Sequence, residues 1–231
     1  MVVEIEKQTK NPHLIKKILD KLPPWLQDIA GLAGFIIMII VGAIIINNFV
    51  FRSFDVIGPS MEPTLEGEGS SDRLIVNRLP ITWAKLNGKD YLPHRGDIVV
   101  FENPKDYTLD GREYIVKRVI GLPGETVKIN NCELKVYNKD NQLGFNPYED
   151  FQKQGKLDPN DKAVNNCIDG DGTNVTVPSG EIFVVGDHRT GSYSMDSRNG
   201  GGRSSLGLVP LKNIIGPVSA RLWPIDKFRT F

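Results

Sequence analysis

A serine stands in a setting that suits nucleophilic catalysis. Ser60 lies in residues 58–65, GPSMEPTL, where a glycine and two prolines give a stiff and turned backbone. Such a turn can hold a hydroxyl and a backbone N–H toward one point, as a nucleophile and its oxyanion site require. An ordinary loop serine has the same local pattern, so this octapeptide alone leaves both interpretations open.

A lysine with the potential to act as a base follows further along the chain. Lys117 lies in the apolar run YIVKRVI of residues 114–120. In a strand, Lys117 and Arg118 point to opposite faces, so one of them shares a face with β-branched neighbours. Burial disfavours a charged amine and lowers its pKa from about 10.4 toward the neutral range that a general base needs. The alternative is a surface lysine whose amine stays in water.

Acidic and basic residues gather near the C-terminal end. Asp196 and Arg198 follow the sequence Gly-Asp-His-Arg at 186–189 and precede three glycines at 200–202. This composition predicts a buried ion-pair network that fixes a loop. Solvated turn charges are the alternative, whereas a phosphate loop would need a Gly-Lys-Ser/Thr ending that is missing. His188 also allows a different reading, a Ser-His-Asp hydrolase that uses Ser60.

Metal and nucleic-acid functions find little support in the sequence. The three histidines are scattered, and the segment Asp169–Asn174 lacks the glutamate that a calcium loop carries at position twelve, where Gly180 stands. Formal net charge is zero, so no basic field favours nucleic acid. We therefore expect no metal, no cofactor and no nucleic-acid partner.

The strongest feature of chain organisation is an uncharged stretch of 23 residues between Asp28 and Arg52. About 20 helical residues cross the hydrocarbon core of a bilayer, so residues 29–51 are predicted to be a transmembrane helix. A cleavable secretory signal would have a shorter apolar region. Five lysines in residues 1–28 favour a cytosolic N-terminal segment, with residues 52–231 on the far side of the membrane.

Beyond residue 52 the pattern changes to short β-type runs separated by turns, which predicts a mainly antiparallel β domain. Residues 138–175 are rich in Asn, Asp, Gly and Lys and are expected to be irregular, so that about 130–180 forms a small second lobe or insertion. One helical turn is expected at 209–214. The predicted strands are 73–77, 97–101, 114–120, 126–129, 134–137, 176–177 and 181–185.

The chain has two cysteines, Cys132 and Cys167, which are too few for a disulfide scaffold. If this part of the chain lies outside the cytosol, one bridge between them is feasible. Two unpaired thiols fit the sequence equally well.

Taken together, these segments resemble the bacterial type I signal peptidases in order, type and spacing. SMEPTL at 60–65 is similar to that family's nucleophile box, and YIVKRVIGLPGE at 114–125 to the box that holds its base lysine. RGDIVVF at 95–101 resembles the strand between them, and GDHRTGSYSMDSR at 186–198 the last box. The resemblance covers essentially residues 29–218.

The resemblance implies a catalytic dyad of Ser60 as nucleophile and Lys117 as general base. Ser194 matches the serine that orients the lysine, although the last box carries two extra residues that make Ser192 a rival. Asp196 and Arg198 match a salt-bridged loop pair. No cofactor is implied.

Pocket residues and two departures from the family pattern also follow from the resemblance. Met61, Leu65 and Val116 fall where the family lines its pockets for small side chains, which favours cleavage after Ala-x-Ala. Some members have an oxyanion-donating serine two residues before the nucleophile, where this chain has Gly58, and His188 replaces the usual asparagine of the last box.

The implied protein is a monomeric, single-pass peptidase of the bacterial cytoplasmic membrane. Its partners are the lipid bilayer and the signal peptides of exported preproteins. Three alternatives stay open: the His188 hydrolase, a self-cleaving protein like the soluble repressors that share the dyad, and a single-pass β-domain receptor or assembly protein without enzymatic activity. The transmembrane stretch and the lack of a DNA-binding segment oppose the second.

Overall fold

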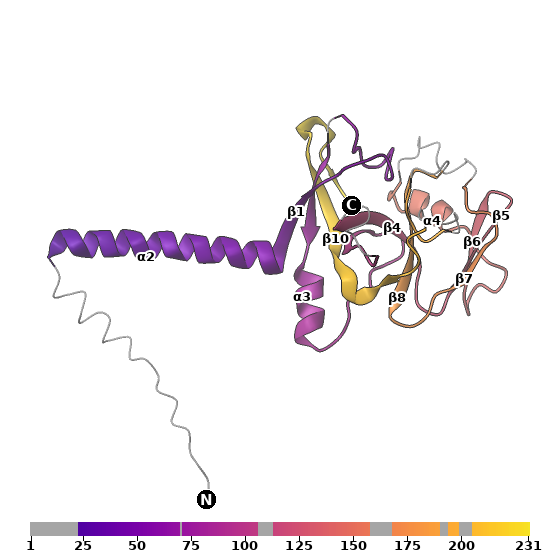
Figure 1. Cartoon of the computed structure of the whole chain (residues 1–231), viewed down its shortest axis with the longest axis horizontal. Helices are drawn as coiled ribbons and strands as arrows, with labels where there is room; N and C mark the ends of the chain where they lie inside the picture. Colours follow the sequence, from indigo (N-terminus) through magenta and orange to yellow (C-terminus); the bar gives the residue numbers. More distant parts are fainter. Residues whose placement is uncertain (1–22, 70, 106–112, 158–167, 190–193, 199–204) are drawn as a thin grey trace, which may run out of the picture. The chain divides into compact units, whose positions relative to one another are not determined.

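The structure is a computed structural model, and it describes residues 23–69, 71–105, 113–157, 168–189, 194–198 and 205–231. The chain divides into two compact units, an N-terminal unit of residues 1–47 and a β unit of residues 48–231 (Figure 1). Most of the predicted cytosolic segment, residues 1–22, lies outside the described part. The candidate chemistry lies entirely in the β unit.

Helix α2 (Pro24–Ile45) forms most of the apolar stretch, and a π-helical turn (Ile46–Val50) continues it. None of its residues is buried within the chain. The apolar helical segment is therefore Pro24–Val50, long and apolar enough to cross a membrane. It begins five residues before the predicted start at 29, because Pro24 fits the first helical turn, where no amide donor is needed. Phe51, expected at the end of the span, instead begins a strand.

Within the described residues, the larger sheet has eight strands in the order β1-β2-β10-β3-β4-β8-β9, with β11 pairing to β10. All of these pairs are antiparallel, which confirms the predicted fold class. The strands are β1 (Phe51–Asp55), β2 (Arg73–Asn77), β3 (Ile98–Glu102), β4 (Tyr114–Gly121), β8 (Glu181–Val185), β9 (Val209–Pro210), β10 (Ile214–Trp223) and β11 (Arg229–Thr230).

β4 lies inside this sheet, between β3 and β8. The β-branched residues on either side of Lys117 and Arg118 are typical of a strand that is covered on both faces. Ile115 and Val119 pack in one buried cluster, Val116 packs against a second, and Ile120 belongs to a third. A polar side chain on β4 therefore has little contact with water.

The stretch predicted to form a small second lobe is more regular than its composition indicated. Strands β5 (Thr126–Asn130), β6 (Glu133–Tyr137) and β7 (Thr173–Thr176) form a three-stranded antiparallel sheet within the described residues. Helix α4 (Pro147–Lys153) lies in the stretch expected to be irregular, capped by Asn146, whose side chain accepts from the Tyr148 N–H. Tyr148 and Phe151 are fully buried, and this apolar anchoring outweighs the polar composition.

Other elements, among them helix α3 (Leu79–Leu86) and β10, were not predicted from the sequence. Helix α3 follows β2 directly and lies at one edge of the β unit (Figure 1). The helical turn expected at 209–214 is only the short 3₁₀ turn Leu211–Asn213, and Ile214 begins the long strand β10. β10 pairs with both β3 and β2, and its register shifts along each pairing. Such bulges interrupt the alternation of buried and exposed residues by which a strand is predicted from sequence.

Cys132 is disulfide-bonded in the structure, so the bridged alternative holds for this cysteine. Cys167, the other cysteine of the sequence, lies outside the described residues. Cys132 has a positive φ in the tight turn between β5 and β6.

Candidate active site

The turn that carries Ser60 is fixed by buried side chains and by a close backbone pair. Met61 and Leu65 follow the serine and are fully buried in the cluster formed with β2, β3 and β10. The Gly58 N–H donates to the Gly67 carbonyl (3.1 Å), and a Cβ added at Gly67 would overlap the backbone of Gly58. The turn therefore needs glycine at its base and presents a half-buried Ser60 from an anchored backbone.

Lys117 projects from β4 toward this turn. Its side chain is buried, and its Nζ donates to the Ser60 Oγ over 2.7 Å and to the Val116 carbonyl over 2.7 Å. The two residues are 57 positions apart in the sequence, so only the fold joins them. The structure thus brings the predicted nucleophile and the predicted base into direct hydrogen-bond contact.

Arg118, the other basic residue of β4, is buried as well, so both basic residues of this strand are buried where only one was predicted to be. Its guanidinium binds Asp187 with two hydrogen bonds (2.8 and 2.6 Å) and donates to the Gly96 carbonyl (2.9 Å). The Arg118–Asp187 ion pair fixes the segment after β8 to strand β4. Buried arginine with a bidentate carboxylate is a geometrically specific contact.

A second buried pair supports the other side of the site. Asp196 accepts from Arg198 Nε (2.9 Å) and Nη2 (2.8 Å), from the Gly186 N–H (3.1 Å) and from the Ser194 hydroxyl (2.7 Å). Burial alone would raise the pKa of Asp196, but the hydrogen bonds and charge of Arg198 hold it below its usual value. The ion-pair network expected from composition is therefore present, and it includes Ser194; Ser192 lies outside the described residues.

Gly186 lies between the nucleophile turn and the Ser194 side chain, and no role for it was predicted from the sequence. A Cβ added at Gly186 would overlap both the Ser194 Oγ and the Ser60 carbonyl oxygen. Its neighbour His188 donates its N–H to the Ser60 carbonyl (3.2 Å), and the His188 Nδ1 lies 3.1 Å from the Pro59 carbonyl. The segment 186–188 thus lies directly on the backbone of the nucleophile turn. A glycine after an apolar strand is the only sequence signal for this contact.

The three predicted pocket residues differ in their surroundings. Met61 and Leu65 lie within the core cluster of the nucleophile turn, whereas Val116 is half-buried at its edge. Among the described residues, no group of three or more His, Cys, Asp and Glu side chains is placed to hold a metal ion. The chemistry available at the site is that of a hydroxyl, an amine and backbone amides.

Replacing Asp196 with asparagine is expected to lower the free energy of unfolding by about 3 kcal/mol, because the buried Arg198 charge loses its partner. The folded pKa of Asp196 is lowered, so its contribution is fully present above the unfolded value, near 3.8, and is lost as pH falls through the folded value. Denaturant unfolding in detergent should therefore show a constant deficit above about pH 4 that shrinks in stronger acid.

The matched control for this variant is Asp140→Asn, which makes the same change at an exposed turn residue. It should leave the free energy of unfolding within about 0.5 kcal/mol of the parent. Equal stability of the Asp196→Asn protein and the parent would show that the Asp196–Arg198 pair contributes nothing to folding.

Comparisons with known proteins show the family of the chain. The family model described as "Signal peptidase, peptidase S26" matches residues 29–223. Signal peptidase I P of Bacillus subtilis subsp. natto is 37% identical over 194 residues, which cover 84% of this chain and 89% of that protein. Signal peptidase IB of Staphylococcus aureus strain COL is 31% identical over 214 residues, which cover 93% and 94%. A solved signal peptidase I from Enterococcus faecalis V583 covers 54% of this chain and 95% of its own, at 27% identity and a TM-score of 0.33.

A match of this length places the chain among the peptidases of the S26 signal peptidase family. The curated relatives are bacterial signal peptidases I, so the chain belongs to the type I signal peptidases, serine endopeptidases that remove signal peptides. The resemblance noted in the sequence is thereby confirmed at the level of the family. The roles of individual residues are a separate question.

Proposed function

We propose that this chain is a membrane-anchored serine endopeptidase that cuts exported preproteins after Ala-x-Ala with a Ser60/Lys117 dyad. The observation that carries the proposal is the 2.7 Å hydrogen bond between Lys117 Nζ and Ser60 Oγ, made by an amine that is buried. A buried amine favours its neutral form, and a neutral amine next to a hydroxyl can accept its proton.

The reaction proceeds in two halves. The Ser60 Oγ attacks the scissile carbonyl as Lys117 takes the hydroxyl proton, and the tetrahedral intermediate collapses to an ester when Lys117 gives this proton to the leaving amine. Lys117 then takes a proton from water, which attacks the ester carbonyl, and returns it to the Ser60 Oγ as the acid product leaves. The Ser60 backbone N–H is the proposed oxyanion donor.

The remaining residues hold the dyad and select the substrate. Ser194, through Asp196 and Arg198, fixes the loop beside the lysine, since all three side chains are buried and joined by hydrogen bonds. Met61, Leu65 and Val116 are the proposed pocket residues that favour alanine over larger side chains. The half-buried Val116 is accessible to a substrate, whereas the fully buried Met61 and Leu65 lie in the core cluster and keep the turn rigid.

Location follows from the apolar helix. We place the segment Pro24–Val50 across the bacterial cytoplasmic membrane, with the lysine-rich N-terminal residues in the cytosol and the β unit outside. The disulfide of Cys132 supports this side of the membrane, because disulfides persist in oxidising compartments. Ser60 follows Val50 by only ten residues, so the nucleophile stays near the bilayer, where a signal peptide ends. The working form is a monomer.

The experiment is cleavage of a purified preprotein by the full-length protein in detergent, with the new N-terminus read by mass spectrometry. A signal peptide ending in Ala-x-Ala should be cut after its last alanine. Phenylalanine at that last position should lower kcat/KM at least tenfold, because an oversized side chain in a packed pocket costs about 1–3 kcal/mol.

The Ser60→Ala protein, purified in parallel, reports any contaminating peptidase, and Ser53→Ala is the matched change at an exposed serine of β1. Equal cleavage of the alanine and phenylalanine substrates would refute the proposed specificity. Equal cleavage by the Ser60→Ala protein would refute the proposed nucleophile.

A further inference from the structure

Helix α3 presents an apolar face that the fold of the β unit does not use. Leu79, Trp83 and Leu86 are spaced four and three residues apart and therefore share one side of the helix. They are 48%, 71% and 76% exposed, whereas Ile81 on the inner side is only 4% exposed. Single exposed apolar residues are common, but a contiguous group that includes a tryptophan is typical of a binding surface.

The structure ties α3 to the end of the apolar helical segment. The Thr82 hydroxyl donates to the Phe49 carbonyl (2.9 Å), and the Arg78 N–H donates to the Val50 carbonyl (2.8 Å). Phe49 and Val50 are the last two residues of that segment. An eight-residue helix is only about 12 Å long, so all of α3 lies close to the point where the chain leaves the apolar segment.

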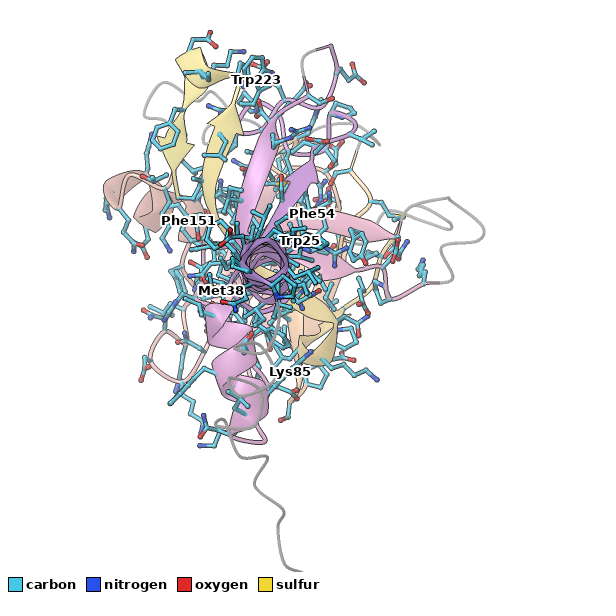
Figure 2. The ribbon with its side chains drawn as sticks, turned by 90° about the vertical axis from the view of Figure 1, so that its left-hand side faces the viewer. Trp25, Met38, Phe54, Lys85, Phe151 and Trp223 are labelled. Carbon is cyan, nitrogen blue, oxygen red and sulfur yellow. The ribbon has the colours of Figure 1, made fainter. Side chains whose placement is uncertain are left out.

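The charged residues around α3 favour an anionic partner. Residues 78–89 contain three basic residues, Arg78, Lys85 and Lys89, and no acidic residue. Lys85 and Lys89 are exposed, and Figure 2 shows the Lys85 side chain outside the ribbon at the end of the β unit opposite Trp223. A short helix with leucine and tryptophan on one face and lysine beside them is the pattern of helices that lie in a membrane interface.

We propose that α3 lies in the headgroup region of the bilayer, with Leu79, Trp83 and Leu86 among the lipids and Lys85 and Lys89 against anionic headgroups. The proposal rests on the proposed membrane span of Pro24–Val50, because it takes the bilayer surface to be next to Val50. A protein partner of the same chemistry would have to occupy space that the membrane already fills.

For the reaction, docking of α3 would fix the distance between the active site and the bilayer. β1 begins at Phe51, opposite Asn77 and beside α3, and runs five residues to Asp55, just before the nucleophile turn. Five strand residues span about 17 Å, so the β1–β2 pair is a rigid spacer between α3 and Ser60. A docked α3 would limit tilting of the β unit and keep Ser60 at one distance from the bilayer.

The first test measures where Trp83 lies. In the full-length chain, Trp25→Phe and Trp223→Phe leave Trp83 as the only tryptophan, and the protein is reconstituted in vesicles of phosphatidylcholine and phosphatidylglycerol. Lipids brominated at a shallow acyl position should quench the Trp83 emission, whereas aqueous acrylamide should quench it weakly. Strong quenching by acrylamide, or no effect of brominated lipid, would overturn the proposal.

The second test separates docking from catalysis. The double variant Trp83→Lys/Leu86→Lys should cut a vesicle-bound preprotein about tenfold more slowly, because two apolar contacts with lipid are lost. Its cleavage of a short soluble peptide in detergent should equal that of the parent. Leu143→Lys makes the same change at a 93% exposed leucine of the second lobe and should match the parent on both substrates.

An equal loss on both substrates, or no loss on either, would overturn the role of α3 while leaving the peptidase intact. The proposed membrane span is tested separately, by washing the vesicles with alkaline carbonate. The parent protein should stay in the vesicles. Release by carbonate would refute the span itself, and a parent protein that cuts neither substrate would refute the proposed function.

Discussion

Replacing Lys117 with alanine is expected to lower kcat/KM for a preprotein by a factor on the order of 10⁴, to the level of the Ser60→Ala protein. The Lys117 Nζ contacts the Ser60 Oγ directly, and a serine hydroxyl without a proton acceptor is a weak nucleophile. Single-turnover cleavage of a radiolabelled preprotein can measure rates that are on the order of 10⁴ below that of the parent.

The two residues act on one step, so their losses should not add. The double variant Ser60→Ala/Lys117→Ala is expected to be no slower than either single variant, as is usual for catalytic groups that work as a unit. Lys212→Ala, at an exposed lysine of the 3₁₀ turn, is the matched control and should keep full activity. A Lys117→Ala protein that cleaves at the parent rate would leave Ser60 without its proposed base.

The same series decides between the dyad and a Ser-His-Asp arrangement. The His188 Nδ1 lies against the Pro59 carbonyl and the His188 N–H against the Ser60 carbonyl, so both contacts reach the backbone of the turn. His188→Ala should therefore lose only about tenfold, through looser positioning of the turn. A loss as large as that of Lys117→Ala would favour the histidine as base.

Much of the β unit was readable from the sequence because its strands are short, β-branched and separated by turns. The predicted strands at 73–77 and 181–185 match β2 and β8 residue for residue. β1 was missed because its alternating residues follow an apolar helix without a break, and Phe51 extends the uncharged run. Helix α4 was missed because three buried side chains, Pro147, Tyr148 and Phe151, stabilise a segment with a polar composition.

The candidate site likewise has residues that could be predicted from the sequence and a contact that could not. Ser60 and Lys117 could be predicted because a nucleophile turn and a lysine in an apolar strand each have a local pattern. The contact of Gly186 with Ser60 has no such pattern, since it depends on how closely two segments 126 positions apart approach one another. Packing distances of this kind are set by the whole fold and are not visible in spacing or composition.

Gly186→Ala is expected to lower kcat by about 100-fold, although alanine is the smallest possible change. The added Cβ would overlap the Ser194 Oγ, which can rotate, and the Ser60 carbonyl, which is backbone and cannot move alone. The nucleophile turn would therefore shift relative to Lys117, and a displacement of about 1 Å in a catalytic pair costs on the order of 10² in rate. The measurement is kcat for a soluble peptide, with thermal unfolding recorded in parallel.

A Ser194→Ala background tells which of the two overlaps matters. Removing the Ser194 hydroxyl relieves one overlap and leaves that with the Ser60 carbonyl, so Gly186→Ala should still cost about 100-fold in the Ser194→Ala protein. Gly42→Ala, where an added Cβ meets no atom within 4 Å, is the control for an ordinary glycine substitution and should be neutral. If the cost of Gly186→Ala disappeared in the Ser194→Ala background, the glycine would serve only to accommodate that hydroxyl. The nucleophile turn would then be held by Met61, Leu65 and its own hydrogen bonds, because the segment after β8 would no longer be needed to position it.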